Sequence, residues 1–354
     1  MVLSFDISPE REGSKLNYFY RQLTRTPAKV RGVDLSGKTA IVTGSNVGIG
    51  LECSRQLLDL GLSKLILAVR NMSKGHIAAR ELAEGRSLDK GAIEVWKLDY
   101  YCYQSTCTFV ERTKSLGRLD IVILNAGIMM TEPKINPHTG HEDTIQVNYL
   151  TTAILAILLL PVLKEKQSLD GQPGRITITS SDSAAWARFS ERNVIPLLPS
   201  LDKSGGIDMM NRTYLSKLLG QMFLTELAKR VPSSVAIINM ATPMMVYDSE
   251  FTRDTARSFH GKINKAIRRC IGYKAAVGAR MVVDAAVNHG EETHGQYLGL
   301  QRVKPMAPIV YTPEGKRLRE RLWRETLEEF SFAGVYAILG EIGCESKESS
   351  LKSE

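Results

Sequence analysis

The chain has 354 residues, of which 43% are hydrophobic and 24% charged, and its formal net charge is +8 at pH 7. These proportions are ordinary for a globular protein that can bury a sizeable core. The basic residues form no stripe interleaved with aromatic residues, and no window approaches 18 consecutive apolar residues. We therefore expect neither a nucleic-acid partner nor a transmembrane segment.

The chain begins with a polar and basic arm, residues 1–36, which contains one amphipathic piece at 16–20. Residues 37–330 alternate between short apolar, β-branched runs and helical patterns. Residues 331–354 hold an apolar segment and then a tail from Glu345 whose composition favours disorder. The patterns predict strands at 39–43, 65–69, 93–98, 121–124, 175–179, 234–239 and near 295–298, with helices at 52–60, 78–84, 109–115, 143–163 and 212–230.

Strands that are each followed by a helix form βαβ units, and such units build a parallel sheet covered by helices on both faces. The predicted fold class is therefore α/β. We expect a single doubly wound Rossmann domain with a parallel sheet of about seven strands.

The cysteines argue against both disulfides and metal binding. There are five of them, an odd number, and no two have CxxC spacing. No metal site is therefore predicted. Residues 1–6 lack the apolar run of a signal peptide, so the expected location is the reducing environment of the cytoplasm.

The first predicted strand leads directly into a glycine-rich turn, residues 43–50, with the spacing GxxxGxG, and a helix follows. Glycines let the backbone approach a pyrophosphate closely, and the N-terminus of the helix offers N–H groups and a favourable dipole. The strand–turn–helix context makes this pattern specific. The predicted cofactor-binding residues of the turn are Gly44, Ser45, Asn46, Gly48, Ile49 and Gly50.

The end of the second strand indicates which dinucleotide binds. An acidic residue there would bind the ribose 2′-hydroxyl of NAD, whereas an arginine suits the 2′-phosphate of NADP. The segment contains Arg70 and Lys74 and no acidic residue. The sequence therefore predicts NADP(H), with Arg70 as a cofactor-binding residue.

Four further features accompany the glycine turn. Asn125 lies in a Leu-Asn-Ala-Gly segment after the fourth strand, Asp99 follows the third strand, Asn148 lies in the long helix, and Ser181 follows the fifth strand. With these features the chain resembles the short-chain dehydrogenases/reductases. It is most similar to the retinol-dehydrogenase-like members of filamentous fungi.

The resemblance implies roles for these residues. Asp99 and Asn125 would contact the cofactor, Ser181 would hydrogen-bond the substrate carbonyl, and Asn148 would support a water-linked proton relay. In the family a tyrosine exchanges a proton with the substrate oxygen. A lysine four residues later lowers the pKa of that tyrosine and holds the nicotinamide ribose. Here the candidates are Tyr214 and Lys217.

The spacing of these two residues departs from the family's YxxxK pattern. Tyr214 lies three residues before Lys217, and Thr213 occupies the position four residues before it. On an ideal helix a shift of one residue swings a side chain by about 100°. Thr213 cannot replace a phenol, because its hydroxyl is far less acidic and its side chain is shorter.

Three interpretations stay open. A wide turn or bulge could bring Tyr214 to the site, and reduction would then proceed as in the family. Alternatively, the cofactor pocket is kept while redox chemistry is lost, so that the protein catalyses a cyclisation, an isomerisation or a dehydration. In the third interpretation the protein binds a dinucleotide without catalysis.

The substrate side shows a second departure. Met244 replaces the glycine that usually follows Pro243 in the family, and a side chain there is expected to need a different backbone path. By analogy with the family, Met244, Met245, Trp186 and Phe189 suggest an apolar pocket for a medium-sized organic molecule. The resemblance implies a small-molecule substrate bearing a ketone or enone, from fungal secondary metabolism, and a monomer or homodimer.

Overall fold

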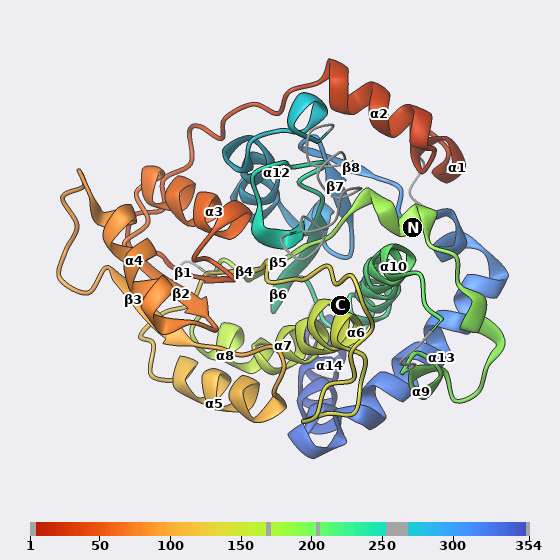
Figure 1. The fold of residues 1–354 in the computed structure, drawn as a ribbon. Coiled ribbons are helices and arrows are strands. Elements are labelled where there is room, and N and C mark those ends of the chain that lie inside the picture. The colour runs from red at the N-terminus through yellow and green to blue at the C-terminus, as the bar shows by residue number, and fades with distance from the viewer. Residues whose placement is uncertain (1–4, 168–170, 203–205, 253–267, 352–354) are drawn as a thin grey trace.

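The computed structural model describes residues 5–167, 171–202, 206–252 and 268–351. One sheet runs through the molecule, in the strand order β3-β2-β1-β4-β5-β6-β7-β8 (Figure 1). Strands β1 to β7 pair in parallel, as the βαβ pattern predicts. The strands are β1 Thr39–Thr43, β2 Lys64–Val69, β3 Ile93–Lys97, β4 Ile121–Leu124, β5 Gly174–Thr179, β6 Ala236–Ala241, β7 Tyr297–Gly299 and β8 Arg302–Lys304.

Strands β1 to β7 form the parallel sheet of about seven strands that the sequence predicted, and one further strand, which was not predicted, extends it. The additional strand, β8, pairs antiparallel with β7 across a tight turn. Leu300 and Gln301 form this turn with positive φ angles of 50° and 63°, the backbone that two-residue hairpins need. A three-residue strand of mixed polarity carries too short a pattern to be recognised in the sequence.

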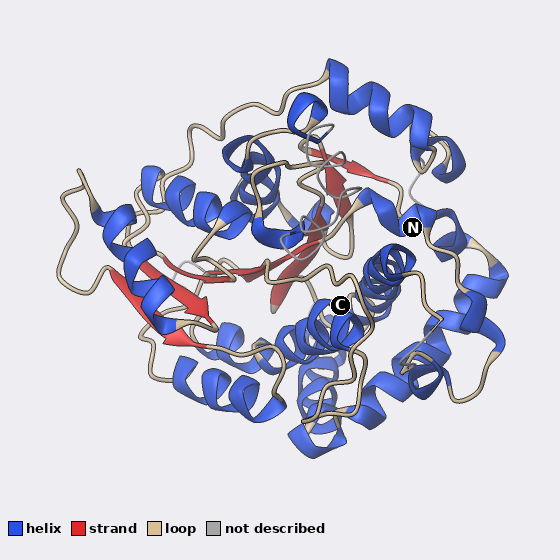
Figure 2. Ribbon diagram, viewed as in Figure 1, coloured by secondary structure: helices blue, strands red, loops and turns tan. Residues whose placement is uncertain are grey.

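Helices cover both faces of the sheet (Figure 2). The longest helical stretch, Asp143–Glu165, is apolar enough to cross a membrane, but 94% of its most apolar window is buried inside the fold. The main helices are α1 Pro9–Glu12, α2 Lys15–Thr24, α3 Gly48–Asp59, α4 Met72–Ala83, α5 Tyr103–Thr113, α6 Asp143–Ile145, α7 Thr151–Leu158, α8 Leu160–Glu165, α9 Leu197–Ser200, α10 Met209–Leu227, α12 Ala275–Val287, α13 Pro313–Glu329 and α14 Val335–Leu351.

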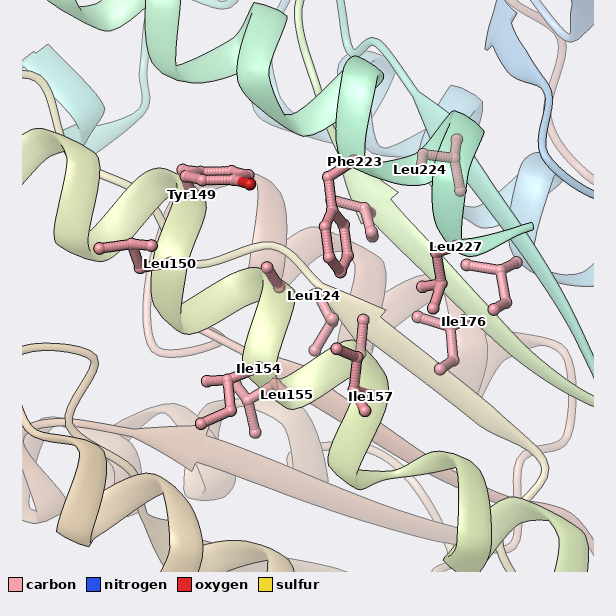
Figure 3. Close-up of a cluster of buried hydrophobic side chains, with 14 of the residues drawn as sticks. Leu124, Tyr149, Leu150, Ile154, Leu155, Ile157, Ile176, Phe223, Leu224 and Leu227 are labelled. Carbon is pink, nitrogen blue, oxygen red and sulfur yellow. The ribbon is translucent and has the colours of Figure 1, made fainter. Parts of the chain in front are cut away.

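The core lies in two parts, one on each face of the sheet, because successive strand residues point to opposite sides. In β1, Ile41 belongs to one cluster, whereas Ala40 and Val42 belong to the other. The first cluster packs the sheet against α7 and α10, where Phe223 and Leu227 face Ile157 and Ile176 (Figure 3). The second packs it against α3 and α12. Packing on both faces holds the central strands in place, and the site lies at their carboxyl ends.

The arm lies against the domain through helices α1 and α2. At the other end of the chain, α14 continues to Leu351, through the first seven residues of the tail for which the composition predicted disorder. Between α6 and α7 the chain forms a π-helical turn, Gln146–Leu150, which includes Asn148. Single π-turns inside α-helices are frequently found at functional sites.

Candidate active site

A cavity of about 640 Å³ opens at the carboxyl ends of the central strands. In doubly wound sheets this edge, where the strand order reverses between β1 and β4, is the usual ligand site. The cavity is continuous from the glycine turn to α10, the arm and the 243–251 segment. Of the predicted site residues, those that line it are Gly44, Asn46, Gly48, Ile49, Arg70, Asp99, Asn125, Ser181, Tyr214 and Lys217.

The glycine turn has the geometry that a close backbone approach requires. Gly44 and Gly48 have φ angles of 63° and 58°, in the left-handed region that disfavours side chains. At Gly50 a Cβ atom would lie 2.4 Å from the carbonyl oxygen of Gly44, so only glycine fits. Helix α3 begins at Gly48 and presents its N-terminus to the cavity. A dinucleotide pyrophosphate therefore fits this turn.

Two predicted residues of the turn do not line the cavity. Ser45 is fully buried, and Gly50 packs against Gly44. Both shape the turn from behind. Asn125, by contrast, lines the cavity and ties the turn to the end of β4. Its side-chain amide donates to the carbonyl of Thr43 at 3.1 Å, while its backbone N–H donates to the Thr43 hydroxyl at 2.9 Å.

Arg70 and Asp99 line the end of the cavity near β2 and β3. Arg70 is exposed, and its guanidinium lies 5.1 Å from the ring centre of Tyr101, over its face. Asp99 accepts a hydrogen bond from the backbone N–H of Tyr101 at 3.1 Å. This end of the cavity therefore offers a cation and a carboxylate, each in contact with Tyr101.

The hydroxyl of Ser181 is oriented by its neighbour Ser183. The backbone N–H and the hydroxyl of Ser183 both donate to the Ser181 Oγ, at 3.2 and 2.9 Å. Because its oxygen already accepts twice, Ser181 can give its own hydrogen to an oxygen atom in the cavity.

The next residue, Asp182, anchors this loop from below. It is buried and accepts hydrogen bonds from Thr242 and Tyr297, each at 3.2 Å, and from Lys304. Burial would raise the pKa of Asp182, but Lys304 and Arg21 outweigh it and lower the pKa. Asp182 therefore stays ionised and holds the Ser181 loop to the sheet edge.

Lys217 and Asn148 are also held by the backbone. The Lys217 ammonium donates to the carbonyl of Thr179 at 3.0 Å, and burial lowers its pKa to about 8. Asn148 donates to the carbonyl of Ile128 at 2.9 Å and accepts from the N–H of the same residue at 2.8 Å. It also donates to the Ser216 hydroxyl at 3.1 Å.

Asn148 does not line the main cavity. It lines a second cavity of about 10 Å³, which Ser180, Ser216 and Lys217 also line. This is about the volume that one water needs, and the Oγ of Ser180 is buried there without a partner among the described residues. The lining offers polar groups that such a water requires.

Thr213, Tyr214 and Lys217 lie on one helix, α10. The helix is regular from Met209 to Leu227, so the bulge that would bring Tyr214 into the family position is not formed. Thr213 is buried, and its hydroxyl donates to the carbonyl of Met209 at 3.0 Å. The ring of Tyr214 lies edge-on to Trp186, with centroids 5.8 Å apart. Burial and Asp208 raise the pKa of Tyr214, against a smaller opposing effect of Arg268.

Met244, which was expected to need a backbone path different from that of the family's glycine, has a left-handed backbone. Its φ angle is +55°, in the region that glycine favours and other L-residues disfavour. The N–H of Met244 donates to the Thr242 hydroxyl at 3.1 Å. The side chain lines the cavity, and the local strain is held by the neighbouring segments.

The arm supplies site residues that the sequence did not reveal. Tyr18 and Phe19 line the cavity, and Trp186 donates from its indole N–H to the carbonyl of Gly13 at 2.8 Å. Gln22, which is buried, accepts from the N–H of Met245 at 2.9 Å and donates to the carbonyl of Ile271 at 3.1 Å. These contacts join positions more than 160 residues apart, and the only sequence signal was the amphipathic piece at 16–20.

Arg268 is a further group on the substrate side that the sequence did not reveal. It lines the cavity, is partly buried, and donates to the carbonyl of Val246 at 2.9 Å. Burial lowers the pKa of Arg268, and the neighbouring Tyr18 and Tyr214 oppose this shift. Tyr18, Tyr214 and Arg268 therefore bring three hydrogen-bond donors to the lining of the cavity.

A Rossmann sheet and a cavity that joins a glycine-rich turn to a serine and a lysine are the arrangement expected of a dinucleotide-dependent enzyme. The family model for short chain dehydrogenase matches residues 38–191. The short-chain dehydrogenase fogG of Aspergillus ruber is 44% identical over 97% of this chain and 99% of its own length. The short chain dehydrogenase/reductase mfmJ of Annulohypoxylon moriforme is 41% identical over 96% of this chain and 98% of its own length. The chain belongs to the short-chain dehydrogenase family and is an oxidoreductase of that family.

Solved structures show the same fold at lower identity. A structure from Escherichia coli CFT073, described as a short chain dehydrogenase complexed with NADPH, has a TM-score of 0.56 at 18% identity and covers 77% of this chain and 100% of its own. The 3-ketoacyl-(acyl-carrier-protein) reductase of Brucella melitensis, complexed with NADH, has a TM-score of 0.55 at 19% identity and covers 75% of this chain and 97% of its own.

Proposed function

We propose that the protein is an NADP(H)-dependent dehydrogenase/reductase that acts on a ketone, enone or alcohol of a medium-sized apolar molecule in fungal secondary metabolism. The observation that carries the proposal is that Ser181 and Lys217 share one cavity with the glycine turn. The identified relatives from two fungi support the metabolic setting. The described cysteines are all free, which agrees with a cytoplasmic location.

The preference for NADP(H) rests on Arg70. It lies at the end of β2, where the ribose 2′ position is recognised in Rossmann domains, and no acidic side chain occupies that strand end. The NADPH complex of the similar E. coli structure is compatible with this choice, although the B. melitensis structure holds NADH. Monomer and homodimer both remain compatible with the proposed activity.

The residues divide the reaction among them. A bound nicotinamide cofactor supplies or accepts the hydride. Ser181 donates its free hydrogen to the substrate oxygen and polarises the carbonyl. Lys217 places a positive charge beside the site and can hold the cofactor ribose. The small cavity beside Asn148 can hold the water through which a proton reaches Lys217.

Tyr214 is the phenol available to exchange the substrate proton in this proposal. It lines the cavity next to Trp186, one residue later than the family position. A substrate seated toward Trp186 and Arg268 would bring its oxygen to this hydroxyl. The position of this phenol would therefore determine how the substrate lies in the cavity. Proton transfer is the step in which this site differs most from the family pattern.

A second candidate function is favoured by one specific observation. Thr213 occupies the position four residues before Lys217, and its hydroxyl is engaged by the carbonyl of Met209. With no phenol in that position, the site could catalyse a cyclisation, isomerisation or dehydration. In that case Ser181 and Lys217 would polarise a substrate oxygen without any transfer of hydride.

The experiment combines purified protein, NADPH and a panel of aryl ketones, enones and aldehydes, and follows both cofactor absorbance and products. We expect NADPH oxidation that Lys217→Ala abolishes and Tyr214→Phe lowers by roughly 10²–10⁴-fold, the usual contribution of a general acid. Tyr336→Phe is the matched control, because Tyr336 is 56% exposed on α14.

The outcomes separate the candidates. A substrate that rearranges without NADPH consumption, unaffected by Tyr214→Phe, would favour the non-redox function. If the protein binds NADPH but converts no compound of the panel, both enzymatic proposals are contradicted. The interpretation as a non-catalytic dinucleotide-binding protein would then be favoured.

A further inference from the structure

Helix α2 carries its apolar residues on the outside. Leu16, Phe19, Tyr20 and Leu23 are 87%, 37%, 60% and 64% exposed. Their spacing of three, four and seven residues places them on one face of the helix. Surface helices of a globular protein usually turn such a face toward the core. We call these four residues the α2 stripe.

The inner side of the same helix carries the buried Tyr18 together with polar residues that attach it firmly. Gln22 is only 2% exposed and bonds the backbone of Met245 and Ile271. Arg21 pairs with Glu12, which also lies 3.0 Å from the Lys304 ammonium. Because these buried polar groups fix the orientation of α2, the helix cannot turn its stripe inward without leaving them unpaired. The exposure of the stripe is therefore built into the fold.

The segment that contains the stripe, with the chain just before and after it, is rich in exposed basic residues. Residues 9–31 contain two acidic residues, of which Glu10 is exposed and Glu12 is buried. The unbalanced positive charge would favour a negatively charged partner surface. The exposed basic residues of this segment are Arg11, Lys15, Arg25, Lys29 and Arg31.

The stripe also borders the mouth of the active-site cavity. Phe19 belongs to the stripe and lines the cavity, and Met210, 44% exposed, lines the cavity as well. A ligand that leaves the cavity past Phe19 therefore meets the α2 stripe first.

We propose that the α2 stripe docks on the surface of an anionic phospholipid bilayer. Apolar side chains on one face with basic residues beside them are the composition of helices that lie in the membrane interface. The four apolar residues would enter the boundary between headgroups and acyl chains, and the basic residues would meet anionic headgroups. The mouth of the cavity then faces the bilayer, from which an apolar substrate can enter.

The test is sedimentation of the full chain with sucrose-loaded phosphatidylcholine vesicles, prepared with and without phosphatidylserine. We expect binding to the vesicles with phosphatidylserine that weakens at high salt. The double variant Leu16→Glu and Leu23→Glu should lower binding by about tenfold or more, because it removes apolar insertion and adds repulsion. The matched control is Ile77→Glu, since Ile77 is 57% exposed on α4, far from α2.

Two measurements keep the result independent of folding and of catalysis. Thermal unfolding and NADPH binding of the double variant should equal those of the wild type, because both leucines are exposed. Failure of the wild type to sediment, equal sedimentation of the double variant, or an equal loss with Ile77→Glu would overturn the proposal. A dimer in sedimentation velocity that the double variant dissociates, without vesicle binding, would assign the stripe to a second copy of the chain instead.

Discussion

His141 lies between two carboxylates that come from distant parts of the chain. Its Nδ1 is 2.9 Å from Asp202, in the segment after α9, and its Nε2 is 3.1 Å from Glu329, at the end of α13. The ring is 7% exposed. Burial alone would lower the pKa of His141, but the hydrogen bonds to Asp202 and Glu329 outweigh it and raise the pKa to about 9.

The direction of the pH effect follows from this rise. A group whose pKa is higher in the folded state than in the unfolded state stabilises the fold when it is protonated. The contribution of His141 is therefore complete below its ordinary pKa of 6.5 and is lost as the pH rises through about 9. At 1.36 kcal/mol per pKa unit, the rise corresponds to about 3 kcal/mol of unfolding free energy.

The assay compares wild type and His141→Gln by urea unfolding at about pH 6 and about pH 10. We expect the variant to be less stable by up to about 3 kcal/mol at the lower pH and nearly equal at the higher pH. His76→Gln is the control, because His76 is exposed on α4. An equal difference at both pH values, or the same pattern in the control, would refute the reasoning.

The remaining predictions concern the cofactor and the Met244 turn. Arg70→Ala should weaken NADPH binding by about tenfold or more and leave NADH binding unchanged, because a charge-assisted hydrogen bond contributes roughly 1.5–3 kcal/mol. If a fluorescence titration showed equal losses of NADPH and NADH affinity, it would contradict an interaction of Arg70 with the 2′-phosphate. Since burial lowers the pKa of Lys217 to about 8, NADPH affinity should fall by about tenfold from about pH 7 to about pH 9 in the wild type, but not in Lys217→Arg, which stays charged. Met244→Gly should change the free energy of unfolding by less than about 1 kcal/mol, because relief of the left-handed backbone offsets the lost side chain. Met245→Gly gains no such relief, so chemical denaturation should show a larger loss of unfolding free energy in that variant. Equal losses in the two variants would contradict strain at Met244.

Local patterns predicted the parts of this site that depend on local geometry. The glycine turn needed only a strand, left-handed glycines and a helix start, all of which are encoded within residues 39–59. The displacement of Tyr214 was predicted from helical periodicity alone, and α10 is a regular helix through this position. The sequence could not decide whether a bulge would form, because that depends on what packs around the helix.

The parts that were missed depend on contacts between distant segments. Gln22 is an ordinary polar residue of an amphipathic helix until the fold brings Met245 to it. The left-handed backbone of Met244 could not be predicted for the same reason, because the sequence does not show what compensates a left-handed methionine. Arg268 likewise gained a place at the cavity only through the folding of the segment after β6.

The attachment of the arm also decides how this chain can be shortened. The family model begins at residue 38, so a version trimmed to that boundary would keep every predicted cofactor residue and the sheet. It would nevertheless lose Tyr18 and Phe19 from the cavity wall, and Lys304 would lose its contact with Glu12. Such a shortened protein should still bind a dinucleotide, but the part of the cavity that Tyr18 and Phe19 line would open to solvent.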